Sequence, residues 1–259
     1  MNKPESPPGF IVRTELQKAA FDNGFRIDEG VDAGWLHYRS ATAPGEIWLA
    51  GAGPHGPWFL SLSLCAVAQE LRLPVEVNLS AAHGIATFAF PTLEELHRAL
   101  DHTYRLSVSL PDAPLQQFQS ATATAPRSTE AERLVIQRVG QDIFRQALLR
   151  YWNGRCPLTG ITDPSLLRAS HIVPWAECQT DAHRLDVHNG LLLSALWDAA
   201  FDAGLVTFDD DGRPLCAAAL TPPAAEALMV QTARPLVLTD AHRANLAQHR
   251  ARHDFVQEK

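Results

Sequence analysis

Residues 167–175 read Leu-Arg-Ala-Ser-His-Ile-Val-Pro-Trp, and residues 185–193 read Leu-Asp-Val-His-Asn-Gly-Leu-Leu-Leu. Directly after them, residues 194–205 read Ser-Ala-Leu-Trp-Asp-Ala-Ala-Phe-Asp-Ala-Gly-Leu. The first two stretches are short and apolar and lie on either side of a polar loop, whereas the third has the spacing of a short helix. The sequence therefore predicts the order strand, strand, helix.

A long amphipathic helix is predicted before this segment, over residues 130–151. Its apolar side chains recur every three or four residues and so fall on one face. The apolar face consists of Val135, Val139, Ile143, Ala147 and Tyr151.

Together with Cys-Pro-Leu-Thr-Gly at residues 156–160, these stretches resemble the HNH endonuclease family. The similar branch begins with C-x-x-T-G, has a S-H-I-x-P-W strand and ends in N-G-L-L-L and F-D-x-G-L. The resemblance covers about residues 130–215 and joins several motifs in the right order. It implies a ββα-metal fold and a divalent-metal-dependent DNA endonuclease, for which we consider a role in restriction or defence.

The resemblance also assigns roles to individual residues. It implies that His171 is the general base, that Asn189 braces the loop, and that Asp198 is a metal ligand. A histidine suits the base role because its ordinary pKa lies near 6.5. Asp202 lies four residues after Asp198, so both carboxylates share a helix face and can converge on one hard cation. We expect Mg²⁺ or Mn²⁺, and we expect His171 and Asp198 to face one shallow cleft.

The sequence departs from the family pattern at two positions. Ser170 stands where an acidic residue or histidine often binds metal, and Asp198 stands where the motif has histidine. Aspartate in place of histidine favours Mg²⁺ or Mn²⁺ over Zn²⁺. Glu177 or Asp186, the nearest carboxylates in sequence, is one replacement for the ligand missing at Ser170. A metal held by fewer protein ligands is the other.

Each site residue also has a structural interpretation. A strand histidine is usually structural, Asn189 before Gly190 suits a turn, and Asp202 can hydrogen-bond the loop backbone. A catalytically weak or inactive HNH-fold module that only binds nucleic acid is therefore the alternative function. A protein-interaction module built on the same fold is a third, with no positive signal.

Composition bears on the partners. The 259-residue chain has a net charge of −7, which argues weakly against binding phosphates, but arginine outnumbers lysine 19 to 3. We expect DNA as the partner and consider a homodimer. No apolar stretch is long enough for a membrane span, and the polar, proline-rich start lacks the apolar core of a signal peptide, so we expect a cytoplasmic protein. The arginines that we predict to contact nucleic acid are Arg155, Arg168, Arg250 and Arg252.

The whole chain is predicted to be α+β, with a mixed N-terminal domain followed by the nuclease domain and its flanking helices. We place the first domain at residues 1–118, a small polar linker at 119–129, and the nuclease domain at 130–259 with its core at 151–212. The first domain has no assigned role, and target recognition is one that we consider.

Aromatic and β-branched runs in the first domain predict an antiparallel meander. Its tryptophans and tyrosine suit a sheet core better than a surface that stacks bases. A capping box at Thr92 and Glu95 predicts the start of a helix. The predicted strands are residues 35–39, 46–50, 58–63 and 85–90, the earlier helices are 13–22 and 64–72, and the aromatic residues are Trp35, Tyr38, Trp48 and Trp58.

Overall fold

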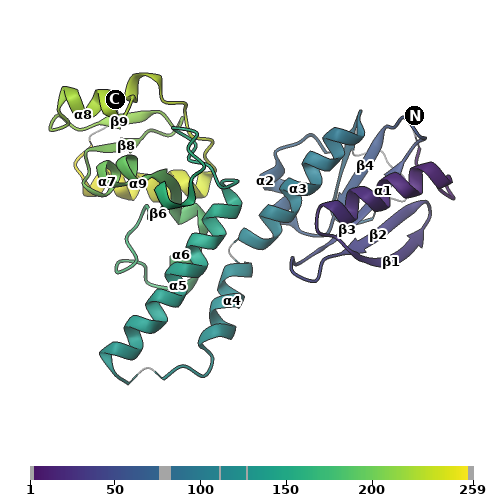
Figure 1. Cartoon of the computed structure of the whole chain (residues 1–259), viewed down its shortest axis with the longest axis horizontal. Coiled ribbons are helices and arrows are strands. Elements are labelled where there is room, and N and C mark those ends of the chain that lie inside the picture. Colours follow the sequence, from purple (N-terminus) through teal and green to yellow (C-terminus); the bar gives the residue numbers. More distant parts are fainter. Residues whose placement is uncertain (1–2, 76–82, 111, 127, 256–259) are drawn as a thin grey trace. The chain divides into compact units, whose positions relative to one another are not determined.

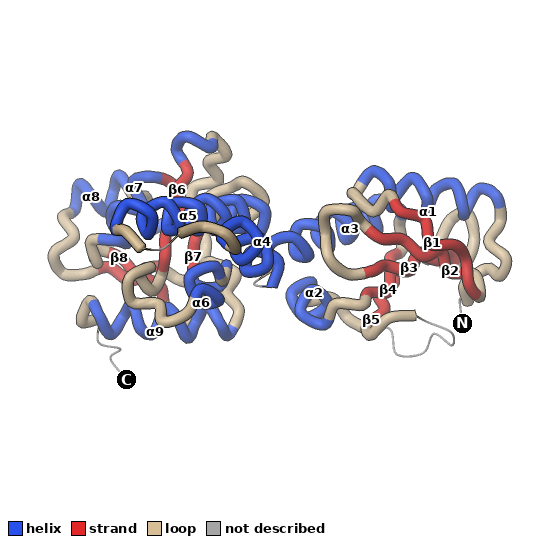
Figure 2. Tube along the Cα trace, turned by 90° about the horizontal axis from the view of Figure 1, so that it is seen from below, coloured by secondary structure: helices blue, strands red, loops and turns tan. Residues whose placement is uncertain are grey.

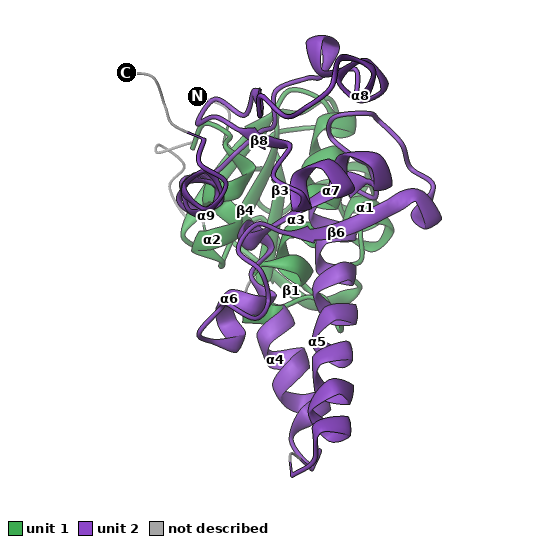
Figure 3. Cartoon of the chain, turned by 90° about the vertical axis from the view of Figure 1, so that its left-hand side faces the viewer, with its two compact units in different colours: residues 1–113 green, residues 114–259 purple. Residues whose placement is uncertain are grey.

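The computed structural model describes the chain except residues 1–2, 76–82, 111, 127 and 256–259. It is a mixed α+β structure, as predicted, and it divides into two compact units. The first unit is Met1–Ala113 and the second is Pro114–Lys259, and Figure 3 colours them separately. Among the described residues, no helix has both the length and the apolar character needed to cross a membrane.

The first unit is a five-stranded antiparallel meander in the order β1-β2-β3-β4-β5. Helices α1 and α3 cover one face of this sheet (Figure 2). Trp35, Tyr38 and Trp58 are almost fully buried, which confirms that most of the aromatic cluster is core. The elements are α1 (Phe10–Asp22), β1 (Ile27–Asp32), β2 (Trp35–Arg39), β3 (Glu46–Gly51), β4 (Trp58–Leu62), α2 (Cys65–Leu71), β5 (Ala86–Phe90) and α3 (Leu93–Ser109).

Most predicted elements of this unit are present within a few residues of their expected bounds. The capping box at the start of α3 is confirmed, since the Thr92 hydroxyl accepts from Glu95 N and the Glu95 carboxylate accepts from Thr92 N. Strand β1 was not predicted. All six of its residues are exposed, so it carries no alternation of apolar and polar side chains.

The second unit is built around the two-stranded sheet of β6 (Leu167–His171) and β7 (Gly190–Ser194). The long helix α5 (Glu130–Tyr151) packs on one face of this sheet and α7 (Ala195–Asp202) on the other (Figures 1 and 3). The remaining elements are α4 (Asp112–Thr122), α6 (Asp181–Leu185), β8 (Val206–Phe208), β9 (Pro214–Cys216), α8 (Pro222–Ala227), α9 (Asp240–Arg252) and three short 3-10 turns, η1 (Pro164–Leu166), η2 (Val187–Asn189) and η3 (Val230–Thr232).

The predicted strand–strand–helix order and the helix over 130–151 both match the structure. Helix α4, by contrast, occupies the first residues of the expected linker and crosses the expected boundary at residue 118. Its Phe118 is buried beneath Gly140 of α5. Small polar composition suggested an exposed linker, but this apolar contact holds the segment in a helix, because tertiary packing overrides local propensity.

Candidate active site

Strand β6 presents its side chains alternately to two helices. Ser170 faces α7, where its hydroxyl donates to Asp202 Oδ1 over 3.4 Å. The next residue, His171, faces α5, where its ring stacks on Phe144 with the ring centres 3.8 Å apart and the planes at 17°. Adjacent residues of a strand point to opposite faces, so the Ser170 hydroxyl and the His171 ring lie on different sides of β6.

The expectation that His171 and Asp198 share one cleft is therefore not met. Asp198 lies one turn before Asp202 on the same face of α7, and the Ser170 hydroxyl acts on the pKa of both carboxyls. The histidine and the carboxylates are separated by the backbone of β6. They can approach a common group only around the end of the strand, where His171 is the last residue.

The His171 ring is held in one tautomer. Its Nε2 lies 2.9 Å from the backbone oxygen of Arg184. A carbonyl oxygen only accepts, so Nε2 carries the proton and Nδ1 keeps its lone pair. No described residue hydrogen-bonds that Nδ1. Burial lowers the pKa of His171, more than the bond to Arg184 raises it, so the ring is neutral near pH 7.

The accepting carbonyl is itself fixed by the Arg184 side chain. That guanidinium donates to Trp175 O over 3.2 Å, to Asp181 Oδ1 over 2.9 Å and to Cys178 O. These bonds tie α6 to the loop that follows β6. The sequence did not predict that Arg184 fixes His171. The bond is accepted by a backbone oxygen, which every residue has, so no side-chain pattern indicates it.

Asn189 is fully buried and joins the two ends of the same loop. Its Oδ1 accepts from Val173 N over 2.8 Å, and its Nδ2 lies within 3.3 Å of Val173 O and His183 O. The side chain therefore fixes the residues that follow His171. The prediction that Asn189 braces the loop agrees with this geometry, and its contact with His171 is indirect.

On the other face of β6, the charges of the two carboxylates are only partly offset by polar partners. Burial raises the pKa of Asp198, and the neighbouring Asp202 carboxylate raises it further. Burial also raises the pKa of Asp202. Ser170 has a single hydroxyl proton, so it can donate to only one of the two carboxylates at a time. This face carries more negative charge than its protein partners neutralise.

The chemistry of these donors fits a hard divalent cation. Two carboxylates and a hydroxyl supply oxygen ligands, and a bound cation would remove the electrostatic cost that raises their pKa values. Among the described residues, however, no three histidine, cysteine, aspartate or glutamate side chains gather as a metal cluster. The described residues therefore place two carboxylates and one hydroxyl at this position.

Neither carboxylate proposed as a replacement ligand faces this pair in the structure. Glu177 forms an ion pair with Arg252 of α9, and Asp186 accepts from His188 over 2.8 Å. Proximity in sequence was misleading because both residues lie in the folded loop between β6 and β7. The structure therefore gives no support to Glu177 or Asp186 as the replacement ligand, and a metal held by fewer protein ligands stays a prediction.

The four predicted nucleic-acid contacts fare differently. Arg250 is buried and donates to Phe208 O and Asp210 Oδ1, each over 2.7 Å, so that prediction is wrong. Its position on a basic helix end gave no sign that the guanidinium points inward. Arg252 is engaged by Glu177, and Arg155 donates to Gly160 O over 2.9 Å while remaining exposed. Arg168 is exposed and lowers the pKa of Asp198, so it lies beside the carboxylates.

Comparison with known families identifies the central segment of this unit. The sequence model of a family described as HNH endonuclease matches residues 156–209, which span both strands, the loop and α7. The C-terminal half contains an HNH domain. Members of this family are typically nucleases that act on DNA and use a divalent metal. A search of curated proteins gave no match to the chain.

Proposed function

We propose that this protein is a divalent-metal-dependent DNA endonuclease in which His171 activates the attacking water. The observation that carries the proposal is the state of His171 at the end of β6. Its ring is neutral, Nε2 is committed to Arg184 O, and Nδ1 has no hydrogen-bond partner among the described residues. That nitrogen can take a proton from water near neutral pH.

The two faces of β6 suit an in-line displacement at phosphorus. In such a reaction the attacking and leaving oxygens lie on opposite sides of the phosphorus atom. A phosphodiester placed across the end of β6 would meet the His171 ring on one side and the Asp198 and Asp202 carboxylates on the other. Separation of the base from the carboxylates is therefore compatible with cleavage, and one shared cleft is not required.

Asp198 and Asp202 would hold the metal, with Mg²⁺ or Mn²⁺ favoured by an all-oxygen donor set. Such an ion supplies charge neutralisation at the phosphate and stabilises the leaving oxygen. Asn189 acts as a positioning residue, because it fixes the loop that carries the Arg184 carbonyl. Arg168 is the arginine best placed to contact a phosphate beside the carboxylates, and exposed Arg155 is a further candidate.

The test is cleavage of supercoiled plasmid by the purified full chain with Mg²⁺ or Mn²⁺. His171→Ala should lower the rate by about 10³-fold, within the range for loss of a general base. His55→Ala, at an exposed loop position in the other unit, is the matched control and should retain full activity. Cleavage that survives His171→Ala would refute the assignment of the base.

A catalytically inactive module that binds DNA is the second candidate, and the presence of only two carboxylate ligands favours it. It predicts no cleavage of any plasmid but retained binding to duplex DNA. The plasmids should be supplied both unmodified and methylated. A role in restriction or defence requires that cleavage depend on that modification, and equal rates on both would argue against such a role.

A further inference from the structure

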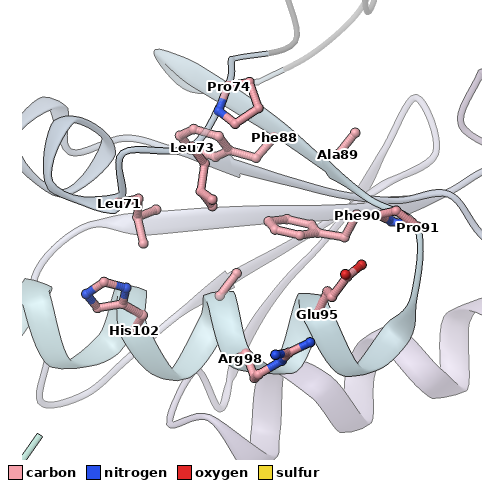
Figure 4. A pocket seen from close by; sticks show the side chains of 11 residues that line it. Leu71, Leu73, Pro74, Phe88, Ala89, Phe90, Pro91, Glu95, Arg98 and His102 are labelled. Atoms are coloured by element: carbon pink, nitrogen blue, oxygen red, sulfur yellow. The ribbon is translucent and has the colours of Figure 1, made fainter.

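Helix α9 lies outside the residues that match the HNH family, but it contacts the loop that fixes His171. The match ends at residue 209, and α9 begins at Asp240. The helix packs on η2, the turn directly before β7. By contrast, the residues that line a cavity of about 400 Å³ between β5 and α3 all belong to the first unit (Figure 4). Helix α9 therefore bears directly on the proposed general base.

Asn245 of α9 bonds this loop at two points. The residue is almost fully buried. Its Nδ2 donates to the backbone oxygen of His188 over 3.0 Å, and its Oδ1 lies 3.1 Å from Nε2 of the His183 ring. An amide oxygen only accepts, so Nε2 of His183 carries the proton. The amide has one donor group and one acceptor atom, and the loop uses both.

The two bonded points lie on either side of the residue that fixes His171. Arg184 directly follows His183, and its backbone oxygen accepts from His171 Nε2 over 2.9 Å. The backbone oxygen of His183 accepts from Asn189 Nδ2 over 3.3 Å. Asn245 thus holds the ring of His183 while Asn189 holds its carbonyl. The peptide that leads into Arg184 is therefore fixed from two directions.

Asn245 joins two short helical turns, each of which has its own cap. Thr180 Oγ1 accepts from His183 N at the start of α6, and Asp186 Oδ1 accepts from His188 N in η2. Helix α6 has five residues and η2 has three, and helical turns this short are not stable by themselves. The caps order each turn separately. The bonds from Asn245 fix one turn relative to the other.

The position of α9 itself does not depend on this amide. Leu246 is fully buried in the core that α9 shares with β7 and α7. The His249 ring is held at both nitrogens, since Nδ1 lies 3.0 Å from Thr207 Oγ1 and Nε2 lies 3.2 Å from Phe201 O. Loss of the Asn245 amide should therefore release the loop and leave the helix in place.

We propose that Asn245 is a positioning residue for the general base, because its bonds to His183 and His188 keep the Arg184 carbonyl aligned with His171 Nε2. The inference rests on the proposed function, in which His171 activates water. With the carbonyl aligned, Nε2 carries the proton and Nδ1 presents a lone pair. When the carbonyl moves, the neutral ring can exchange its proton between the two nitrogens, and less of it has the lone pair at Nδ1.

The test compares Asn245→Leu with Gln248→Leu in the purified full chain. Leucine keeps the branched shape of asparagine but has no polar atom. Gln248 is an exposed amide of the same helix and is the matched control. At saturating Mn²⁺, Asn245→Leu should lower kcat for plasmid cleavage by about 10–100-fold, the range for loss of an orienting group, with KM unchanged. Gln248→Leu should change neither constant.

A second measurement reports on the His171 ring without any reaction. With ¹⁵N-labelled histidine, nitrogen NMR distinguishes a protonated ring nitrogen from one that has a lone pair. The signals of His171 are those missing from His171→Ala. The wild-type protein and Gln248→Leu should show the proton on Nε2 alone. Asn245→Leu should show both tautomers, which a purely structural role of the amide does not predict.

The other partner of the bond gives a second pair of variants, which decides the question if Asn245→Leu does not fold. His183→Leu removes the donor and should lower kcat as Asn245→Leu does. His183→Gln keeps an N–H near the position of Nε2 and should restore most of the rate. A rate as low in His183→Gln as in His183→Leu would overturn the proposal.

The proposal is also overturned if Asn245→Leu lowers the melting temperature but leaves kcat and the His171 spectrum as in the wild type. The amide would then only stabilise the fold. Failure of the wild-type protein to cleave any plasmid refutes the proposed function instead. In that case the ring spectra alone support or overturn the positioning role, because they need no substrate.

Discussion

The two faces of β6 differ in how completely their polar groups are satisfied. On the α5 side, His171 has a stacked aromatic neighbour and a fixed carbonyl partner. On the α7 side, two carboxylates share one serine hydroxyl, and the pKa of each is raised. The first face lacks only a partner for His171 Nδ1, whereas the second is electrostatically unsatisfied. In the proposed function, the first face supplies the general base and the second holds the cation.

The largest effect predicted after that of His171→Ala tests the unsatisfied face. Asp198→Asn should lower cleavage by more than about 10²-fold, because a lost metal ligand removes several kcal/mol of stabilisation. The same change should raise the melting temperature of the metal-free protein by about 1–2 °C. Plasmid cleavage and calorimetry measure the two effects, and Asp163→Asn at an exposed loop position is the control.

The sign of the stability change follows from the direction of the pKa shift. A carboxyl whose pKa is higher in the folded state than in the unfolded state costs stability when it is ionised. The cost is complete above the folded pKa and disappears below the unfolded one. A neutral amide removes it at pH 7. A fall in melting temperature on Asp198→Asn would mean that the carboxylate is satisfied in the folded protein.

The next effect concerns the loop that fixes His171 on the α5 side of β6. Asn189→Ala should reduce cleavage by about 10–100-fold, the range for loss of a group that orients a catalytic ligand. It should also destabilise the protein by about 1–3 kcal/mol, because Val173 N loses its partner while buried. Saturation with Mn²⁺ should not restore the rate. If it does, Asn189 supports the metal side of the strand instead.

A smaller effect is expected from making the unsatisfied face more acidic. Ser170→Asp should tighten Mn²⁺ binding by about tenfold, since each 1.4 kcal/mol of added attraction changes affinity by that factor. It should lower the melting temperature without metal, because three carboxylates would then repel one another. Calorimetric titration measures the affinity, and Ser170→Ala is the control. Unchanged affinity would show that residue 170 does not reach the ion.

The smallest effect is on the pH profile. Cleavage at saturating Mn²⁺ should decline as pH falls through the lowered pKa of His171, so its midpoint should lie below the ordinary value near 6.5. Phe144→Leu exposes the ring and should move that midpoint upward. Phe118→Leu removes a different buried ring, which belongs to α4 and lies beside Gly140 of α5. This control variant should leave the midpoint of the pH profile unchanged. Equal shifts in both variants would exclude the stacked ring as the cause.

The motifs predicted the order of elements and the identity of the chemical groups better than their spatial relations. Periodicity placed α5 at its observed bounds, and the motif pattern selected His171 and Asp198. The sequence could not show that the Arg184 carbonyl fixes the histidine, because any residue supplies that atom. It also misplaced Arg250, since burial of a guanidinium depends on oxygens from distant segments.

Gly190 is a second feature whose role could not be predicted from the sequence. A side chain there would collide with Phe144 and Leu148, so the glycine lets α5 reach the sheet. In the motif, Asn-Gly suited a turn, which needs no tertiary contact. The close approach of helix and strand becomes evident only when the two are assembled.

Side chains of β6 point alternately to its two faces, so the number of residues in the strand affects function. Ser170 and His171 differ by one step along the backbone, and one step decides which helix a side chain meets. Loss of a single residue within the strand would change none of the chemical groups, but it would turn each one toward the opposite layer. Related sequences that preserve this chemistry should therefore keep an unbroken count between the start of the strand and its histidine.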